Sequence, residues 1–549
     1  MTLSKKIIIS SLLTFSLISI FFKLYLIDFS IPLFSDSLDY TLHTISMTNG
    51  QFLQHPERHS GWPIFASLFS NLLDSPNFLD YSNMMRILSL MISSATIFVI
   101  YLLGRKFFSQ KYSLIMASLF AFQPHLNHIA GFGLAEPSFF LITILSFYFI
   151  LTNNPRYTII AFILAAVVWW IRPSGIIIFL PLIIVYLLNL RKNKHSYKIL
   201  VVSIIVFFTI SSLMLSERNE QFGSPTYSWL GDRLWIGDYE KSISSNIDSK
   251  SYTPSSYIEE HGVLGFIKNF IVDGTISIFS ILSKIMFPYL IFLTPLGIIL
   301  SFKTINENPK FVKANWIFII ITLAIMTLVI SLNPERRFLL YLYPFLIIFA
   351  TIFIQRFTEY GLSALSFNPK QKNLFLIIFV CSVVIVSGLF TLRYDSPDLI
   401  LENEKIQFTK YMEENFQGGM LFDSGDTQVY FAHPILWENS ELLNQIKIDS
   451  EWNDSKHIVF LPDTTRLVKT SVFGNSIEEL VENGKSHNLQ FIFSTEYGDS
   501  FYPFVDELYH DETKYPYLEK IFDSEEFDFK KFKIKAFKIN YEKFNEIKN

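Results

Sequence analysis

The chain has 549 residues, of which 50% are hydrophobic and 17% aromatic, and its net charge is −4. Its mean hydropathy is +0.34, and only 17% of its residues are charged, well below the roughly 25% of soluble domains. This composition excludes an ordinary soluble enzyme and a disordered protein. The single cysteine, Cys381, excludes an intrachain disulfide framework and a cysteine-rich metal site.

The net charge is the average of two unlike parts. Residues 393–549 contain 30 acidic and 17 basic residues, a net charge of −13. Residues 1–392 contain the other 19 acidic and 28 basic residues, a net charge of +9. Because the long apolar runs lie in the first part, we expect a membrane region over 1–392 and a soluble domain over 393–549.

Apolar runs in the first part predict its transmembrane helices. A spanning helix needs about 20 apolar residues, and two shorter runs are accepted as well, which predicts about eleven helices. The first run follows Lys5 and Lys6, is too long for a signal-peptide core and lacks a cleavage site, so we expect a membrane anchor. The runs are 6–27, 84–103, 112–122, 134–152, 157–170, 174–190, 197–215, 284–302, 314–333, 337–355 and 372–392.

The charges of the connections orient these helices. With a cytoplasmic N-terminus, every second connection is rich in Lys and Arg, which is the positive-inside pattern. The long connections 28–83 and 216–283 then lie on the outer side, together with three short ones. An odd number of spans also places the C-terminal domain outside the cytoplasm.

The outer connections contain acidic residues and arginines. Carboxylates such as Asp36, Asp39 and Glu136 suit base catalysis or metal binding. Arginines at a lipid boundary suit a phosphate group, which a guanidinium binds through two parallel hydrogen bonds. Simpler interpretations are solvated loop acids, a helix cap at Glu136 and arginines that reach the interface. The other charged or polar candidates on this side are Tyr40, Arg58, His59, Arg172, Glu335, Arg336 and Arg337.

Other site chemistries have weaker support in the sequence. His125 and His128 have the helical spacing of a metal pair, but no convincing third ligand accompanies them, which disfavours a zinc site. The chain contains no Gly-rich phosphate loop, Walker motif or nucleophile elbow. Nothing in it indicates nucleic-acid binding.

Several segments occur in an order typical of one superfamily. They are PLFSDSLDYTLHTISMTNGQF with HSGWPIFASLF, GLAEPSFFLITILSFYF, WWIRPSGIIIFLPL, ERNEQFGSPTYSWLGDRLWIGD, SYIEEHGVLGFIKNFI and NPERRFLLYLYPFLI. Together they resemble the GT-C superfamily of polytopic membrane glycosyltransferases. The closest likeness is to the branch of protein mannosyltransferases and aminoarabinose transferases that uses dolichyl- or polyprenyl-phosphate sugars. The WWDYG signature of oligosaccharyltransferases is absent, which disfavours transfer of a whole glycan.

The resemblance implies roles for individual residues. Asp36 matches the leading catalytic aspartate of the family, whose usual second acid is Ser37 here, so that the next acid is Asp39. Glu136 precedes a proline at the start of a span, and Arg218 matches an RN-x4-G pattern in the second long loop. The implied catalytic residues are Asp36, Asp39 and Glu136. The implied substrate-binding residues are Tyr40, His59, Arg172, Arg218, Arg336 and Arg337.

The resemblance also implies a reaction on the outer face of the membrane. A sugar, mannose or a similar hexose or pentose, moves with inversion from a polyprenyl- or dolichyl-phosphate donor to a protein, glycan or lipid acceptor. Asp36 acts as general base, Asp39 or Glu136 orients the acceptor, and Arg172, Arg336 or Arg337 stabilises the phosphate leaving group. No cofactor is certain, and a role for a divalent metal stays open.

The C-terminal part has the pattern of a small α/β domain. Residues 404–416 have a helical pattern, and MLFDSG, KHIVFLPD and LQFIFST have the pattern of buried strands. SIEELVENGKSHN is predicted to be a helix before the last of these strands, and the alternating tail FKKFKIKAFKIN to be a strand. The sequence thus predicts an α-helical polytopic membrane protein with a C-terminal extracytoplasmic α/β domain.

Two other functions remain open. A transporter or flippase of a lipid-linked glycan would have inverted repeats and charged residues inside its spans. We find no repeat, and the middle parts of the predicted spans lack acidic residues. A non-catalytic membrane scaffold that presents the outer domain would leave the carboxylates of the outer loops unexplained.

Overall fold

The computed structural model is mostly helical. It describes residues 3–33, 36–50, 58–73, 77–152, 154–190, 195–237, 252–302, 308–394, 399–422, 447–448, 459–460, 467–469, 472, 474–496 and 502–548.

Within these residues, seven helical segments are long and apolar enough to cross a membrane. They confirm the predicted α-helical polytopic membrane protein. The segments are α1 (Lys5–Tyr25), α4 (Phe78–Phe107), α10 (His195–Phe222), the continuous run from α13 to α14 (Pro254–Met286), α16 (Pro309–Leu332), the run from η6 to α18 (Arg336–Ala364) and α19 (Pro369–Thr391).

Shorter helices complete the helical body. Four of them are also apolar: α7 (Glu136–Ile150), α8 (Pro155–Ile171), the run Pro173–Leu188 that includes α9 (Phe179–Val185), and α15 (Leu290–Ser301). The others include α2 (Asp36–Thr48), α3 (Gly61–Ser67), α5 (Gln110–Ala121), α6 (Pro124–Ala130), α11 (Trp229–Arg233) and α17 (Tyr343–Arg356).

In two segments the observed helices have other lengths than the predicted spans and loops. The number of membrane crossings therefore stays a prediction. The run 112–122 lies in α5, which has 12 residues. At about 1.5 Å per residue this helix is shorter than the hydrocarbon layer of about 30 Å. Residues 254–283, predicted within the outer connection, belong instead to the long apolar run Pro254–Met286.

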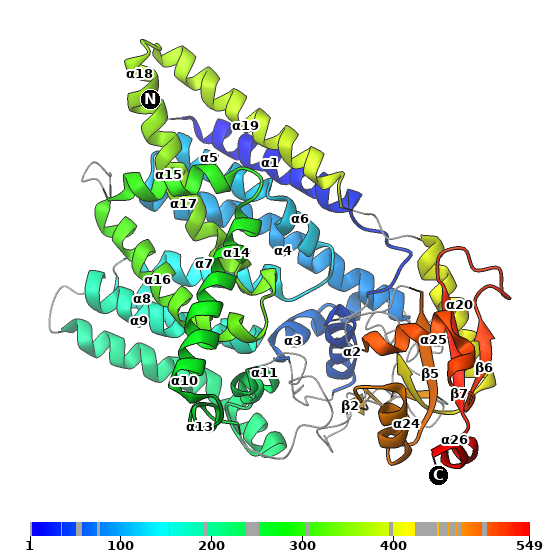
Figure 1. The fold of residues 1–549 in the computed structure, drawn as a ribbon. Helices are drawn as coiled ribbons and strands as arrows, with labels where there is room; N and C mark the ends of the chain where they lie inside the picture. Colours follow the sequence, from blue (N-terminus) through cyan, green and yellow to red (C-terminus); the bar gives the residue numbers. More distant parts are fainter. Residues whose placement is uncertain are drawn as a thin grey trace.

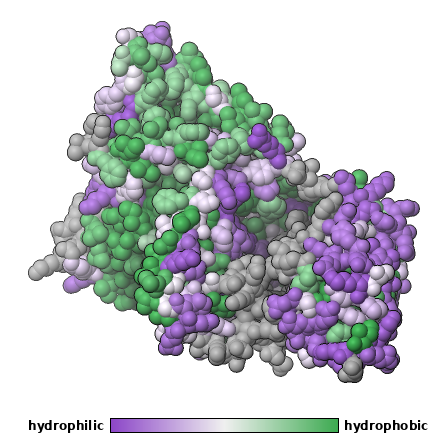
Figure 2. Space-filling view, in the orientation of Figure 1, coloured by the Kyte–Doolittle hydropathy of each residue, from purple (hydrophilic) through white to green (hydrophobic). Residues whose placement is uncertain are grey.

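The helical body and the C-terminal part have different surfaces. α1 and α19 lie side by side along one edge of the body (Figure 1), and a Cβ atom on Gly388 of α19 would lie 3.5 Å from Phe22 of α1. The visible surface of the body is largely hydrophobic, whereas the C-terminal part is largely hydrophilic (Figure 2). α2 and α3 lie between the two parts, and α2 contacts β2 (Lys447–Ile448).

The C-terminal part confirms the predicted α/β character. Its five-stranded sheet has the order β4-β1-β5-β7-β6, in which β1 is parallel to β4 and β5, and β7 is antiparallel to β5 and β6. KHIVFLPD contributes β3 (Val459–Phe460), which pairs with β2 in a separate sheet. The other elements are α20 (Leu399–Asn415), β1 (Gly418–Phe422), β4 (Leu467–Lys469), α24 (Ile477–Lys485), β5 (Leu489–Thr495), α25 (Asp506–His510), β6 (Leu518–Asp523), β7 (Ile534–Ile539) and α26 (Tyr541–Lys548).

Both faces of this sheet are covered. Phe491 and Phe493 of β5 pack with Phe408 of α20, whereas Ile492 packs with Leu480 of α24. Successive residues of a strand point to opposite faces. A strand that is covered on both faces can therefore be apolar at successive positions, which explains the run Phe491–Phe493 in β5.

Close packing of α15 against α17 gives a test of the helical body. A Cβ atom on Gly297 of α15 would overlap the carbonyl oxygen of Phe349 in α17. We therefore expect Gly297→Ala to separate the two helices and to destabilise the protein by about 1–3 kcal/mol.

Thermal unfolding of the detergent-solubilised protein, followed by tryptophan fluorescence, measures this effect. Gly388→Ala is the matched control, because the nearest side-chain atom to its new Cβ lies at 3.5 Å, an ordinary contact. Equal melting temperatures for the two variants would show that the α15–α17 contact is looser than described.

Candidate active site

The first part of the site lies at the start of α2. Asp36 is the first residue of this helix, and Asp39 follows in the same turn. Residues three apart lie on the same side of a helix, so both carboxylates lie near its N-terminus. The partial positive charge of the helix N-terminus favours their ionised forms.

Arg58 contacts both carboxylates. Its Nη2 donates hydrogen bonds to Asp36 Oδ1 and to Asp39 Oδ2, at 2.7 Å each, and its Nε donates to Asp39 Oδ2 at 3.2 Å. The side chain of Arg58 is 13% exposed. Its guanidinium carbon lies 5.4 Å from the ring centre of Tyr40, which is buried on α2. This burial raises the pKa of Tyr40.

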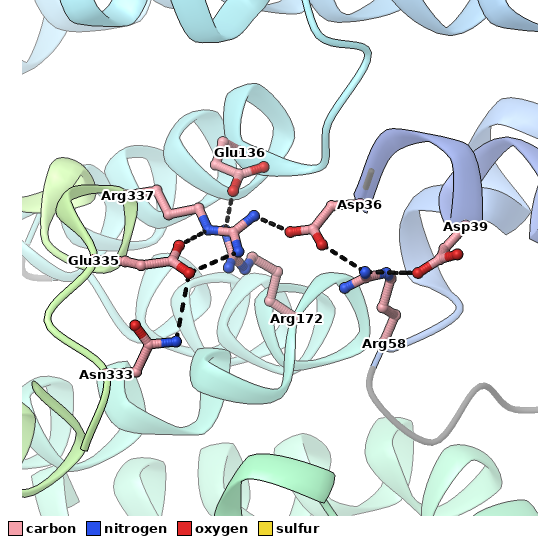
Figure 3. A network of polar contacts seen from close by, with 8 residues as sticks. All are labelled: Asp36, Asp39, Arg58, Glu136, Arg172, Asn333, Glu335 and Arg337. Atoms are coloured by element: carbon pink, nitrogen blue, oxygen red, sulfur yellow. Dashed lines mark hydrogen bonds and ion pairs between the residues drawn. The ribbon is translucent and has the colours of Figure 1, made fainter. Parts of the chain in front are cut away.

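Arg337 joins the same group from a segment that is 301 residues away from Asp36 in the sequence. It follows α16 and donates hydrogen bonds to Asp36 Oδ2 and to Glu335 (Figure 3). Asn333 donates a further hydrogen bond to Glu335 at 3.4 Å. Burial raises the pKa of Glu335, and the Asn333 hydrogen bond and the nearby Arg172 oppose this shift.

Glu136 and Arg172 form the remaining pair. Glu136 is 1% exposed, and its Oε1 accepts a hydrogen bond of 2.5 Å from Arg172. Its Oε2 is buried without a hydrogen-bond partner among the described residues. Glu136 therefore makes an ion pair, and the residue that precedes α7 as its cap is Ala135. Figure 3 shows this pair next to Arg337 and Asp36.

His59 holds the first loop against α8. In a regular helix, the carbonyl of Trp169 would accept from the N–H of residue 173, but Pro173 has none. His59 Nδ1 lies 2.5 Å from this carbonyl oxygen, and because a carbonyl can only accept, Nδ1 carries the proton. Burial, reinforced by the charge of Arg218, lowers the pKa of His59 to about 3. His59 is therefore neutral and is better suited to position the loop than to exchange protons.

Arg218 lies close to His59 rather than in the carboxylate network. It is buried in α10, and its Nε and Nη2 donate to the carbonyl of Tyr227 at 2.9 and 2.6 Å. The rings of Phe222 and Tyr227 flank its guanidinium at 5.0 and 5.9 Å.

Arg336 lies outside the described network. Its side chain is exposed, and its charge acts on His125 and Tyr394. The hydroxyl oxygen of Tyr394 lies 2.5 Å from Nδ1 of His125. The ring of Tyr394 stacks on that of His128, with ring centres 4.3 Å apart. Both histidines therefore contact the chain that follows α19. Across the described residues, no group of three or more His, Cys, Asp and Glu is arranged to hold a metal ion.

The structure thus brings together six of the nine candidate residues: Asp36, Asp39, Tyr40, Glu136, Arg172 and Arg337. Sequence reasoning gave no role to Arg58, Asn333 or Glu335. Arg58 and Glu335 were visible as charged residues of outer loops, but only the folded chain shows which charges pair. Asn333 offers no signal in the sequence beyond its position as the first residue of NPERRF.

Comparisons with known proteins place the fold. No protein-family model matches the chain, and no curated protein matches it by sequence. Several solved structures, however, are similar to this chain. The archaeal oligosaccharyltransferase AglB from Archaeoglobus fulgidus, in complex with an inhibitory peptide and a dolichol-phosphate, is 12% identical, with a TM-score of 0.57 over 89% of this chain and 69% of that one.

Two further structures have the same fold. The A. fulgidus enzyme in complex with Zn and sulfate is 13% identical, with a TM-score of 0.54 over 93% of this chain and 71% of that one. ArnT from Cupriavidus metallidurans, bound to undecaprenyl phosphate, is 12% identical, with a TM-score of 0.51 over 77% of this chain and 84% of that one. The chain therefore has the GT-C fold of membrane glycosyltransferases.

Proposed function

We propose that this protein is an inverting glycosyltransferase, which moves a sugar from a polyprenyl- or dolichyl-phosphate donor to an acceptor on the outer side of the membrane. One observation carries the proposal. Carboxylates and arginines from loops far apart in the sequence form one network within a fold whose solved examples hold a dolichol-phosphate or an undecaprenyl phosphate.

Asp36 is the proposed general base. In the reaction, the acceptor oxygen or nitrogen forms a bond to the anomeric carbon while the bond from that carbon to the phosphate oxygen breaks. The phosphate leaves with the bonding electrons, and the acceptor proton passes to Asp36. A single in-line displacement needs one base and inverts the anomeric carbon. Arg58 and Arg337 fix the carboxylate in one orientation by binding a different oxygen each.

Arg337 and Arg172 are the proposed contacts of the leaving phosphate. Both guanidinium groups lie beside the carboxylates in Figure 3, and a guanidinium stabilises the charge that develops on the phosphate oxygen. Glu136 is the proposed contact of a substrate hydroxyl, because its buried Oε2 has unused acceptor capacity. The proposed sugar is mannose or another hexose or pentose, and the proposed acceptor is a protein, a glycan or a lipid.

Replacing the proposed base gives the main test. We expect Asp36→Asn to lower turnover by roughly 10²–10⁴-fold, because the amide cannot accept the acceptor proton. Release of polyprenyl phosphate, measured with a panel of radiolabelled polyprenyl-phosphate sugars, detects the change. Asp28→Asn is the matched control, since Asp28 lies in the same outer loop and binds Ser30 at the surface. Normal turnover in Asp36→Asn would contradict the assignment.

The neighbouring arginines 336 and 337 test the phosphate contact. We expect Arg337→Gln to lower kcat by roughly 10²–10³-fold, as the loss of a transition-state contact does. Arg336→Gln should cause a much smaller loss, because Arg336 is exposed and lies outside the network. Steady-state kinetics with the same donor measures both. An equal loss in the two variants would assign the phosphate to another cation.

The proposed topology places the active face and residues 393–549 outside the cytoplasm. Because Cys381 is the single cysteine, Cys381→Ser gives a background for labelling. Ser486→Cys, on the exposed end of α24, should react with a membrane-impermeant maleimide in intact cells. Lys370→Cys lies at the N-terminal end of α19, whereas the C-terminal part follows the other end of this helix. This cysteine should react only after the membrane is opened. The reverse pattern would place the C-terminal part in the cytoplasm.

A further inference from the structure

Asp36 and Asp39 pose an electrostatic problem. Two carboxylates three residues apart on one helix repel each other, and each raises the cost of ionising the other. The helix N-terminus offsets only part of this repulsion. A divalent cation with oxygen ligands is one common solution, and a related fold was solved with Zn and sulfate.

In this chain a guanidinium occupies the position between the two carboxylates. Nη2 of Arg58 lies 2.7 Å from an oxygen of each. The second oxygen of Asp36 is bound by Arg337. A divalent cation at this place would replace hydrogen bonds from two guanidinium groups and would lie within a few ångströms of their positive charges. The donor set therefore does not fit a divalent cation.

The surroundings of Arg58 hold its guanidinium in place. The aromatic ring of Tyr40 lies against it, and its side chain is largely buried. The next residue, His59, is fixed to the Trp169 carbonyl of α8. Gly61 brings the start of α3 against the same helix, since a Cβ there would meet the backbone of Trp170 and Ile171. The guanidinium is thus preorganised, so little entropy is lost when it binds the carboxylates.

We propose that Arg58 is the internal cation of this site: a positioning residue that neutralises the Asp36–Asp39 pair in place of a divalent metal ion. The role of the neutralised Asp36 as a base rests on the proposed function. The occupation of the pair by Arg58 does not, and it can be tested without any sugar donor. Asp39, which binds Nε and Nη2 of Arg58, then acts by orienting that guanidinium.

Manganese binding tests the proposal directly. The full-length protein in detergent is titrated with Mn²⁺, and free Mn²⁺ is followed by its electron paramagnetic resonance signal. We expect the wild-type protein and Asp39→Asn to bind Mn²⁺ identically, because Arg58 already fills the position. A Mn²⁺ site that is present in the wild type and lost in Asp39→Asn would overturn the proposal.

A gain of binding is the complementary readout, which a merely misfolded variant would not give. Arg58→Met removes the charge and keeps a side chain of similar length, so the freed carboxylates should bind Mn²⁺ with a Kd of roughly 10⁻⁴–10⁻³ M, as weak oxygen-ligand sites do. Arg58→Lys, which keeps the charge, and the double variant Arg58→Met with Asp39→Asn should both lack this site. A folded Arg58→Met that binds no additional Mn²⁺ would also overturn the proposal.

Turnover gives the third readout and separates this proposal from the proposed function. With any donor that the wild-type protein uses, EDTA should leave turnover unchanged. Turnover that is lost in EDTA and restored by Mn²⁺ would overturn the internal-cation proposal and leave the transferase proposal intact. If no donor in the panel is turned over, the transferase proposal fails, and the Mn²⁺ titrations still decide the role of Arg58.

Discussion

The ion pair between Asp36 and Arg337 connects two loops that are 301 residues apart in the sequence. Arg58 extends it to Asp39, and Glu335 extends it to Asn333. Each of these charged groups is partly buried, so its ion pair offsets part of the hydration that the group loses there. The loops therefore have to meet, and the helices that carry them have to end at the same face of the body.

The helical body meets this constraint through close backbone packing. Glycines at positions 61, 175 and 297 lie where a Cβ would overlap the backbone of a neighbouring segment. Such contacts leave little freedom for the helices to slide. The missing N–H of Pro173 adds a specific attachment point, since His59 satisfies the carbonyl that the proline leaves without its helical partner. Loops with fixed ends can hold charged groups in one geometry, as electrostatic catalysis requires.

The network also bears on the other functions that the sequence left open. A scaffold that presents the C-terminal part needs no buried carboxylate, yet Glu136 is buried with one oxygen unpartnered among the described residues. A transporter would place its charges along a path through the bilayer. Here the charged residues of the network lie in α2, in short loops and at helix ends. A transferase uses charges in this way, because a lipid-linked donor and an aqueous acceptor meet at the membrane boundary.

The sequence by itself determined the class of the protein and most of its helices. Long apolar runs leave a helix as the stable conformation in lipid, and the split between a net charge of +9 and −13 separated the two parts. The strands β1, β3, β5 and β7 of the C-terminal part followed from their alternation or continuous apolarity, whereas β2, β4 and β6 were not predicted. Asp36, Glu136 and Arg337 were identified as candidates from their place in outer loops, together with the superfamily resemblance. The sequence pattern also predicted a buried strand in KHIVFLPD, but it did not show that this strand pairs with β2 in a separate sheet.

The tertiary structure decided which charges meet. Arg336 and Arg337 are adjacent and chemically identical, and only the backbone geometry after α16 directs Arg337 toward Asp36 and leaves Arg336 exposed. Arg58 gave no sign of its role, because its partners are 22 and 19 residues away along the chain. Charge pairing depends on distances in space of a few ångströms, since the Coulomb energy falls with separation and with solvent exposure. A linear sequence shows which charges are available, and the packing of the helices determines those distances.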